Sequence, residues 1–155
     1  MSNRRAMILL LILSGAIISI CMGLRQSLGL FMQPMTVDTG ISIEEAKKRI
    51  GDEKTVFVDI RDVRELEREG MIPDAFHAPR GMLEFWVDPE SPYYKPVFTD
   101  DKTFILYCQA DWRGTLAAVA LGDMGMTNVL HLQGGFGEWR KAGAPTAARP
   151  DKKKS

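Results

Sequence analysis

Short apolar runs that alternate with helical patterns constrain the fold of this chain more than any other feature. Three such runs predict buried strands, at residues 55–59, 103–107 and 128–132. A pattern typical of a helix follows each run, at residues 63–68, 114–124 and 136–142. Alternation of this kind is typical of parallel sheets, because helices supply the crossover connections. The sequence therefore predicts an α/β domain in which helices flank both faces of a parallel sheet.

Shorter elements complete the predicted domain. Ser42 and Glu45 form a capping-box pattern, which predicts a short helix at the start of the domain. A brief strand at residues 75–77 and a helical turn at residues 80–85 come after the first crossover helix. Residues 88–101 are rich in Pro, Tyr and Asp, which is typical of a surface loop.

A cysteine directly follows the central predicted strand. Cys108 ends the apolar run, and only a few residues separate it from the next helix. Ligands bind beyond the carboxyl ends of strands in sheets of this class, which is where Cys108 falls. We expect backbone N–H groups of the loop to converge on the sulfur, and the helix N-terminus to add positive potential. Because the thiolate is the nucleophilic form of cysteine, the sequence predicts sulfur attack on an anionic substrate.

The spacing between Cys108 and Arg113 narrows the chemistry. Cys-x-x-x-x-Arg leaves a tight pocket, sized for one extra sulfur atom on the cysteine. Phosphatases with a cysteine nucleophile carry one more residue in this loop, and Gly114 stands where their arginine would be. A cation is unfavourable at a helix start, so Arg113 is expected to hold an anion there. A cysteine phosphatase is the less favoured alternative.

Four segments, in the same order, resemble the rhodanese family of sulfurtransferases. The first is an apolar strand ending in Asp-x-Arg at residues 56–61, and the second is a segment similar to Gly-His-Ile-Pro-Gly-Ala at residues 69–79. The third is the cysteine loop at residues 107–114, and the fourth is a closing Gly-Gly-aromatic-x-x-Trp motif at residues 134–139. The resemblance runs from about Ile41 to Pro145. It implies a rhodanese-like fold and a cysteine persulfide that accepts sulfur from thiosulfate or a similar donor. The acceptor would be cyanide, a small thiol or a protein cysteine, and no cofactor is required.

The resemblance also implies roles for individual residues. Cys108 and Arg113 are the expected catalytic residues. The expected substrate-binding residues form the rest of the loop: Gln109, Ala110, Asp111, Trp112 and Gly114. Asp59 and Arg61 are expected to support the site as a structural pair that braces the loop.

Three positions depart from the family pattern. Met71 replaces the usual histidine, and Asp74 and Asp111 stand where glycine is common. Aspartate tolerates left-handed backbone angles, so the turn at Asp111 can survive. Its carboxylate, however, would oppose both thiolate formation and an incoming anion. Activity persists if Asp111 points outward. If it points inward, the site is weakly active or selective for uncharged persulfide donors. The alternative function is then a catalytically weak or inactive binding or scaffold module.

Several other side chains receive structural interpretations. Phe136 and Trp139 are expected to anchor the core, and His77 and His131 to be satisfied core histidines. Trp112 either walls the pocket or packs against the domain. The aromatic and acidic segment at residues 81–98 is expected to line the mouth of the active site.

The N-terminal segment predicts a membrane anchor and linker at residues 1–39. Residues 6–24 carry no charge and are long enough to span a bilayer as one helix, although a signal peptide is the competing interpretation. Arg4 and Arg5 precede this run and Arg25 follows it, which places the catalytic domain outside the cytoplasm. Residues 23–36 also resemble the first membrane helix of a major-facilitator transporter. If this segment is a fusion artefact, a cytoplasmic domain is expected.

Charge and cysteine content exclude other classes of function. Residues 41–146 contain 13 basic and 18 acidic side chains, a net charge of −5, which argues against nucleic-acid binding. The predicted domain spans residues 40–146, and residues 147–155 are expected to form a basic, disordered tail. The two cysteines, Cys21 and Cys108, lie in segments of different character, so no disulfide is expected. No spacing typical of a metal site is present, so no metal is expected.

Overall fold

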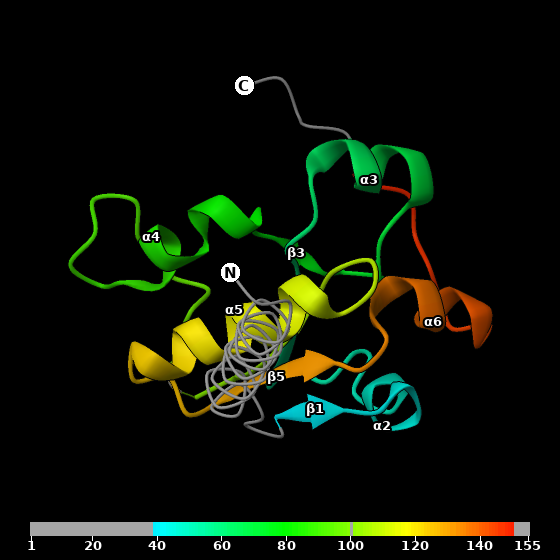
Figure 1. The fold of residues 1–155 in the computed structure, drawn as a ribbon, viewed down its shortest axis with the longest axis horizontal. Coiled ribbons are helices and arrows are strands. Elements are labelled where there is room, and N and C mark those ends of the chain that lie inside the picture. The colour runs from blue at the N-terminus through cyan, green and yellow to red at the C-terminus, as the bar shows by residue number, and fades with distance from the viewer. Residues whose placement is uncertain (1–38, 100, 151–155) are drawn as a thin grey trace, which may run out of the picture. The chain divides into compact units, whose positions relative to one another are not determined.

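The computed structural model describes residues 39–99 and 101–150 (Figure 1). The predicted membrane anchor, and with it the resemblance to a transporter helix, lies outside the described residues. Within the part of the chain that is described, no helix combines the length and the apolar character needed to cross a membrane.

The described residues form a five-stranded sheet in the order β1-β5-β4-β2-β3. Its strands pair in parallel, which confirms the fold class predicted from sequence. In sheet order the strands are β1 (Gly40–Ile41), β5 (Val129–Leu132), β4 (Thr103–Tyr107), β2 (Thr55–Asp59) and β3 (Phe76–His77). Sequence patterns missed β1, because two residues are too few to show a periodicity. The strand that precedes Cys108, β4, is the middle one of the five.

Helices cover both faces of the sheet. Buried side chains of α4 (Leu83–Val87) and α5 (Trp112–Asp123) pack in one hydrophobic cluster. Those of α2 (Ile43–Lys47) and α6 (Gly135–Lys141) pack in a second cluster, and Phe136 and Trp139 of α6 are fully buried there, as predicted. The remaining helices are α3 (Val63–Glu69) and the 3-10 turn η2 (Arg80–Met82).

Strand β4 shows how the sheet separates the two clusters. Phe104 and Leu106 belong to the cluster beneath α4 and α5, whereas Ile105 and Tyr107 belong to the other. Successive side chains of a strand point to opposite faces, so a strand covered on both sides is apolar throughout. The side chain of Cys108 continues this alternation between the two faces, and it lies in the cluster of α4 and α5.

Helix caps agree with the sequence in part. The capping box of Ser42 and Glu45 is present, and it begins the short helix α2 as predicted. A second capping box, formed by Asp62 and Glu65, begins α3. Helix α5 begins at Trp112, two residues before the predicted start, so Arg113 belongs to its first turn.

The domain boundary predicted at residue 146 is too early. Ala147 and Met71 exchange two backbone hydrogen bonds, with N–O distances of 2.8 and 2.9 Å. Arg149 forms an ion pair with Glu67 at 2.6 Å. Figure 1 accordingly shows the chain after α6 running past α3. Residues 147–150 therefore belong to the folded domain, and the final residues, 151–155, lie outside the described part.

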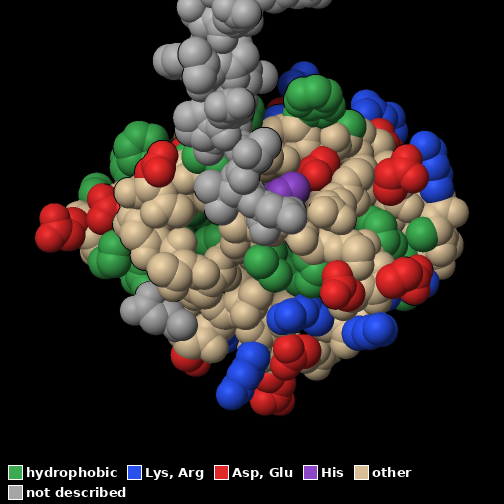
Figure 2. Space-filling view, turned by 60° about the horizontal axis from the view of Figure 1, so that its bottom comes forward, with side chains coloured by type: hydrophobic (Ala, Val, Ile, Leu, Met, Phe, Trp, Pro, Cys, Tyr) green, Lys and Arg blue, Asp and Glu red, His purple; other side chains and the backbone are tan. Residues whose placement is uncertain are grey.

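Charged side chains of both signs are interspersed over the face shown in Figure 2. Among the described residues visible on this face, none form a basic patch of the kind that the phosphate backbone of a nucleic acid requires.

Candidate active site

The candidate site is the loop between β4 and α5. Cys108 stands at the carboxyl end of β4, and its residue is 1% exposed. It is a free thiol. Ala110 and Trp112 are exposed beside it, and Trp112 is 79% exposed. Of the two interpretations of Trp112, packing against the domain is therefore wrong. Cys108 is therefore buried, while neighbouring residues of the same loop reach the surface.

Helix α6 holds the backbone of this loop from behind. The N–H of Phe136 donates to the carbonyl of Cys108 at 2.8 Å, and the N–H of Gly137 donates to the carbonyl of Gln109 at 2.9 Å. Gly135 makes this approach feasible: its φ is +63°, and an added Cβ would lie 2.5 Å from the Cys108 carbonyl oxygen. Neither Gly135 nor Gly137 was predicted as a site residue. The available signal was the cluster of three glycines around Phe136.

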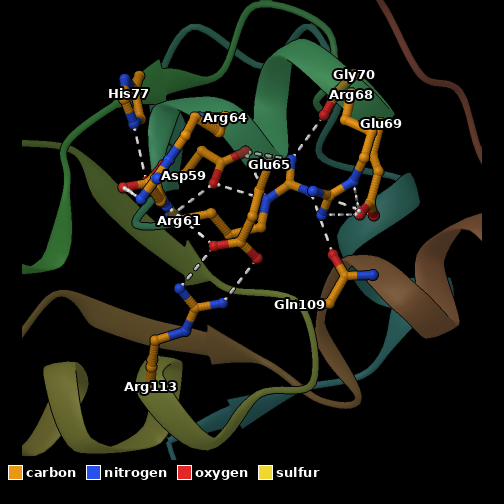
Figure 3. Close-up of polar contacts among 11 residues, drawn as sticks. Asp59, Arg61, Arg64, Glu65, Arg68, Glu69, Gly70, His77, Gln109 and Arg113 are labelled. Atoms are coloured by element: carbon orange, nitrogen blue, oxygen red, sulfur yellow. Dashed lines mark hydrogen bonds and ion pairs between the residues drawn. The ribbon is translucent and has the colours of Figure 1, made fainter.

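Arg113 is held by a carboxylate from another segment. Its two terminal nitrogens donate to the two oxygens of Glu65, both at 2.9 Å (Figure 3). Oε2 of Glu65, which accepts from Nη1 of Arg113, also accepts from the backbone N–H of Asp62 at 3.1 Å, in the capping box of α3. The hydrogen bond from Arg113 lowers the pKa of Glu65. The pKa of Arg113 is raised, chiefly by its hydrogen bond to Glu65 and also through interaction with Cys108.

Arg113 thus interacts with both Glu65 and Cys108. Arg113 was predicted as a site residue, whereas Glu65 was not, because its only local signal was the capping box.

Asp59 and Arg61 form the buried pair predicted to brace the loop. Both side chains are fully buried, and Nη2 of Arg61 lies 2.7 Å from Asp59 Oδ2. The same nitrogen donates to the Gly70 carbonyl at 2.7 Å, and Nη1 donates to the Gln109 amide oxygen at 3.2 Å. The guanidinium also lies 4.0 Å from the centre of the Phe136 ring. Arg61 thus joins β2, the cysteine loop and α6.

The Gln109 side chain takes part in this bracing (Figure 3). Any contact of Gln109 with substrate would therefore fall to its backbone N–H.

Asp111 adopts the left-handed conformation that its residue type permits. Its φ is +69°, and it is the N-cap residue of α5. The carboxylate oxygens lie 2.8 and 3.0 Å from Nδ1 of His131 on β5. A Cβ on Gly114 would lie 2.9 Å from one of these oxygens, so the small residue at 114 makes room for the pair. Asp111 thus points toward β5 at the start of α5, and His131 is a satisfied core histidine, as predicted.

The predicted mouth segment carries exposed aromatic groups. Phe85 and Tyr93 are 54% and 58% exposed, and their ring centres lie 6.4 Å apart in an edge-to-face arrangement. Their contact with a substrate stays a prediction. Among the described residues, no group of three or more His, Cys, Asp or Glu side chains is arranged to hold a metal ion.

Known proteins match this chain over most of its length. A sulfurtransferase of Allochromatium vinosum is 31% identical over 109 residues, which cover 70% of this chain and 94% of that protein. A solved structure from Rhodopseudomonas palustris is 45% identical, with a TM-score of 0.69 over 75% of this chain and 93% of that one. It is described as a protein of unknown function and a possible tyrosine phosphatase.

A more distant structure shows the same fold. The rhodanese-related protein of Thermoplasma volcanium is 21% identical, with a TM-score of 0.59 over 71% of this chain and 98% of that one. The family model described as the rhodanese-like domain matches residues 42–142. The chain therefore belongs to the rhodanese-like family.

Proposed function

We propose that this protein is a sulfurtransferase that carries sulfane sulfur as a persulfide of Cys108. The donor is thiosulfate or a similar sulfane compound, and the acceptor is cyanide, a small thiol or a protein cysteine. The observation that carries the proposal is the position of Cys108 at the end of β4, with the guanidinium of Arg113 fixed beside it by Glu65. The A. vinosum relative, which is named a sulfurtransferase, supports this reaction class.

The orientation of the loop backbone supports anion binding. The carbonyls of Cys108 and Gln109 both point to α6. In a trans peptide the carbonyl and the following N–H point in opposite directions, so the N–H groups of Gln109 and Ala110 are directed away from α6. The twelve-residue helix α5 begins at the same place and adds its positive end. Residues 109–113 can therefore stabilise a negative charge on the transferred sulfur.

The reaction has two balanced half-reactions. The Cys108 thiolate attacks the outer sulfur of thiosulfate, a new S–S bond forms, and the original S–S bond breaks with its electron pair leaving on sulfite. The acceptor thiolate or cyanide then attacks the outer sulfur of the persulfide, and Cys108 leaves as a thiolate. Two half-reactions at one cysteine predict ping-pong kinetics. Because Cys108 is 1% exposed, the reacting atom of the sulfur donor, and that of the acceptor, must each lie on a group narrow enough to reach a buried residue.

Intact mass spectrometry of the full chain tests this proposal. We expect incubation with thiosulfate, under conditions that keep the thiol reduced at the start, to add the mass of one sulfur atom. The Cys108→Ser variant should gain nothing, and cyanide should remove the added mass from the unchanged protein. A folded protein that gains no sulfur from any sulfane donor would favour the inactive binding module.

A cysteine phosphatase is a second candidate, because the R. palustris structure is described in those terms. The short Cys-x-x-x-x-Arg loop opposes it, since it offers one residue fewer to surround a tetrahedral phosphate. Turnover of an aryl phosphate that disappears in Cys108→Ser would establish phosphatase activity. We expect no such turnover.

From the sequence alone we also propose that residues 1–39 tether the domain to a membrane, with the domain outside the cytoplasm. Fractionation of cells that express the full chain tests the tether. We expect recovery with membranes, and loss of that association when Leu13 and Ile17 are both replaced by aspartate. Recovery of the unchanged chain in the soluble fraction would contradict it.

A further inference from the structure

The cation beside Cys108 is already bound by an anion within the protein. Glu65 meets both terminal nitrogens of Arg113, and its side chain is 19% exposed. The Arg113 side chain is 41% exposed, so one side of the guanidinium still faces solvent. An anionic donor that approaches Arg113 therefore meets a charge that Glu65 has largely neutralised.

Other charges around the loop do not restore a positive site. Arg61 is fully buried and paired with Asp59, so it offers no guanidinium face to a ligand. Asp111 adds a carboxylate within the loop, paired with His131 at its Nδ1. The charges of Glu65 and Arg113 offset each other, so together with Asp111 and His131 these side chains add no net positive charge to the site. A dianion and a monoanion should differ strongly in how they tolerate this potential.

On the basis of the sulfur-transfer function proposed above, we propose that Glu65 is a positioning residue that sets the charge of the accepted donor. It fixes Arg113 beside the sulfur and cancels most of its charge. The site thereby favours donors whose sulfane sulfur is attached to a group of low negative charge, such as a hydropersulfide or a thiosulfonate monoanion. Thiosulfate, a dianion, is the disfavoured donor.

The chemistry balances with either favoured donor. With a hydropersulfide, the Cys108 thiolate attacks the terminal sulfur, the S–S bond breaks, and the electron pair leaves on the donor thiolate. The proton stays on the transferred sulfur. With a thiosulfonate monoanion, the leaving group is a sulfinate. Neither reaction needs an oxidant, a reductant or a metal.

The test compares thiosulfate with methanethiosulfonate, which presents the same outer sulfur with one charge fewer. The rate of sulfur loading onto Cys108 is measured by mass for the full chain and for Glu65→Gln, which keeps an oxygen for Arg113 but removes the charge. Loss of one negative charge should raise loading by thiosulfate roughly tenfold and loading by methanethiosulfonate roughly threefold, because the Coulomb energy scales with donor charge. The two donors differ in intrinsic reactivity, so the readout is the change in their ratio.

Glu67→Gln is the matched control. Glu67 lies on the same helix, is 56% exposed and pairs with Arg149, so the substitution removes the same charge away from the loop. It should leave the ratio unchanged. Added salt should speed thiosulfate loading of the unchanged protein, through screening, and affect Glu65→Gln much less.

The outcomes separate the two proposals. If neither donor loads Cys108, the sulfurtransferase function itself fails. If both donors load and Glu65→Gln leaves their ratio unchanged, or slows both equally, Glu65 has a structural role only and the proposal about donor charge is overturned.

Discussion

Two arginines near the cysteine loop are each bound by a carboxylate, yet their surroundings differ. Arg61 and its partner Asp59 are fully buried, and every contact of Arg61 is to the protein. Arg113 is paired with Glu65 but keeps 41% of its side chain exposed. A buried cation that lost its partner would be costly, whereas a part-exposed one can exchange contacts with water or a ligand. The comparison shows that Arg61 is part of the loop's internal bracing, and it is consistent with our proposal that Arg113 acts on the donor.

Replacing Arg61 should have the largest effect. Arg61→Ala leaves the Asp59 carboxylate buried without its partner and removes the link to Gln109. We expect the free energy of unfolding to fall by about 3–5 kcal/mol, measured by urea denaturation. Arg64→Ala is the control, because Arg64 pairs with Asp62 on the surface with 82% of its side chain exposed. Equal stabilities of the two variants would show that the buried pair does not brace the domain.

Gly135→Ala should be next in effect, and it disturbs the loop without changing any charge. The new methyl group would lie 2.5 Å from the Cys108 carbonyl oxygen, on a residue with φ of +63°. We expect a loss of about 3 kcal/mol in stability together with loss of sulfur loading. Gly122→Ala, on α5, is a suitable control, because no atom lies within 4 Å of its added Cβ. Normal sulfur loading by Gly135→Ala would mean that the close packing of α6 does not shape the loop.

Arg113→Ala should affect activity more than stability. Removing the guanidinium should slow sulfur loading of Cys108 about 100-fold, the scale of losing one electrostatic stabiliser. Its part-exposed ion pair should contribute only about 1 kcal/mol to folding. Urea denaturation and the mass-based loading rate on the same samples separate these effects. A stability loss as large as that of Arg61→Ala would remove the distinction between the two arginines.

We expect the smallest effect, a loss of stability contributed by Glu65, when the pH is lowered. The folded pKa of Glu65 lies below its ordinary value of 4.5, because of the hydrogen bond from Arg113. Its contribution to stability is therefore fully present above pH 4.5 and is lost as the pH falls through the folded pKa. The stability difference between the unchanged protein and Glu65→Gln should shrink in that range. Urea denaturation between pH 6 and pH 3, about the span of ordinary carboxyl titration, measures it. A difference that grows in acid would contradict the depressed pKa.

The sequence predicted the parts of the site that depend on local pattern. The strand before Cys108 was predicted with its observed limits, since an apolar run bounded by polar residues is a short-range signal. Asp59 and Arg61, two residues apart, were correctly predicted as a structural pair. The left-handed turn at Asp111 followed from its residue type.

Contacts between distant segments could not be predicted in this way. Glu65 and Arg113 are 48 residues apart, and only the completed sheet brings α3 to the start of α5. The approach of Gly135 to Cys108 likewise depends on how α6 packs. The ordered residues after 146 were missed because their basic composition resembles a solvated tail, whereas the bridge between Met71 and Ala147 and the ion pair of Arg149 hold them. Periodicity describes the neighbours of a residue along the chain and carries little information about which segments meet.

The hydrogen bonds from α6 to the cysteine loop have a consequence for how the protein is made. During synthesis β4 and Cys108 leave the ribosome before residues 135–141, yet the carbonyls of Cys108 and Gln109 find their partners only on that later helix. The loop is therefore completed by the last helix of the domain to emerge. We expect a nascent chain that stops short of α6 to hold a thiol without its anion-binding loop. The domain would thus acquire its reactivity only when nearly its whole length has been synthesised.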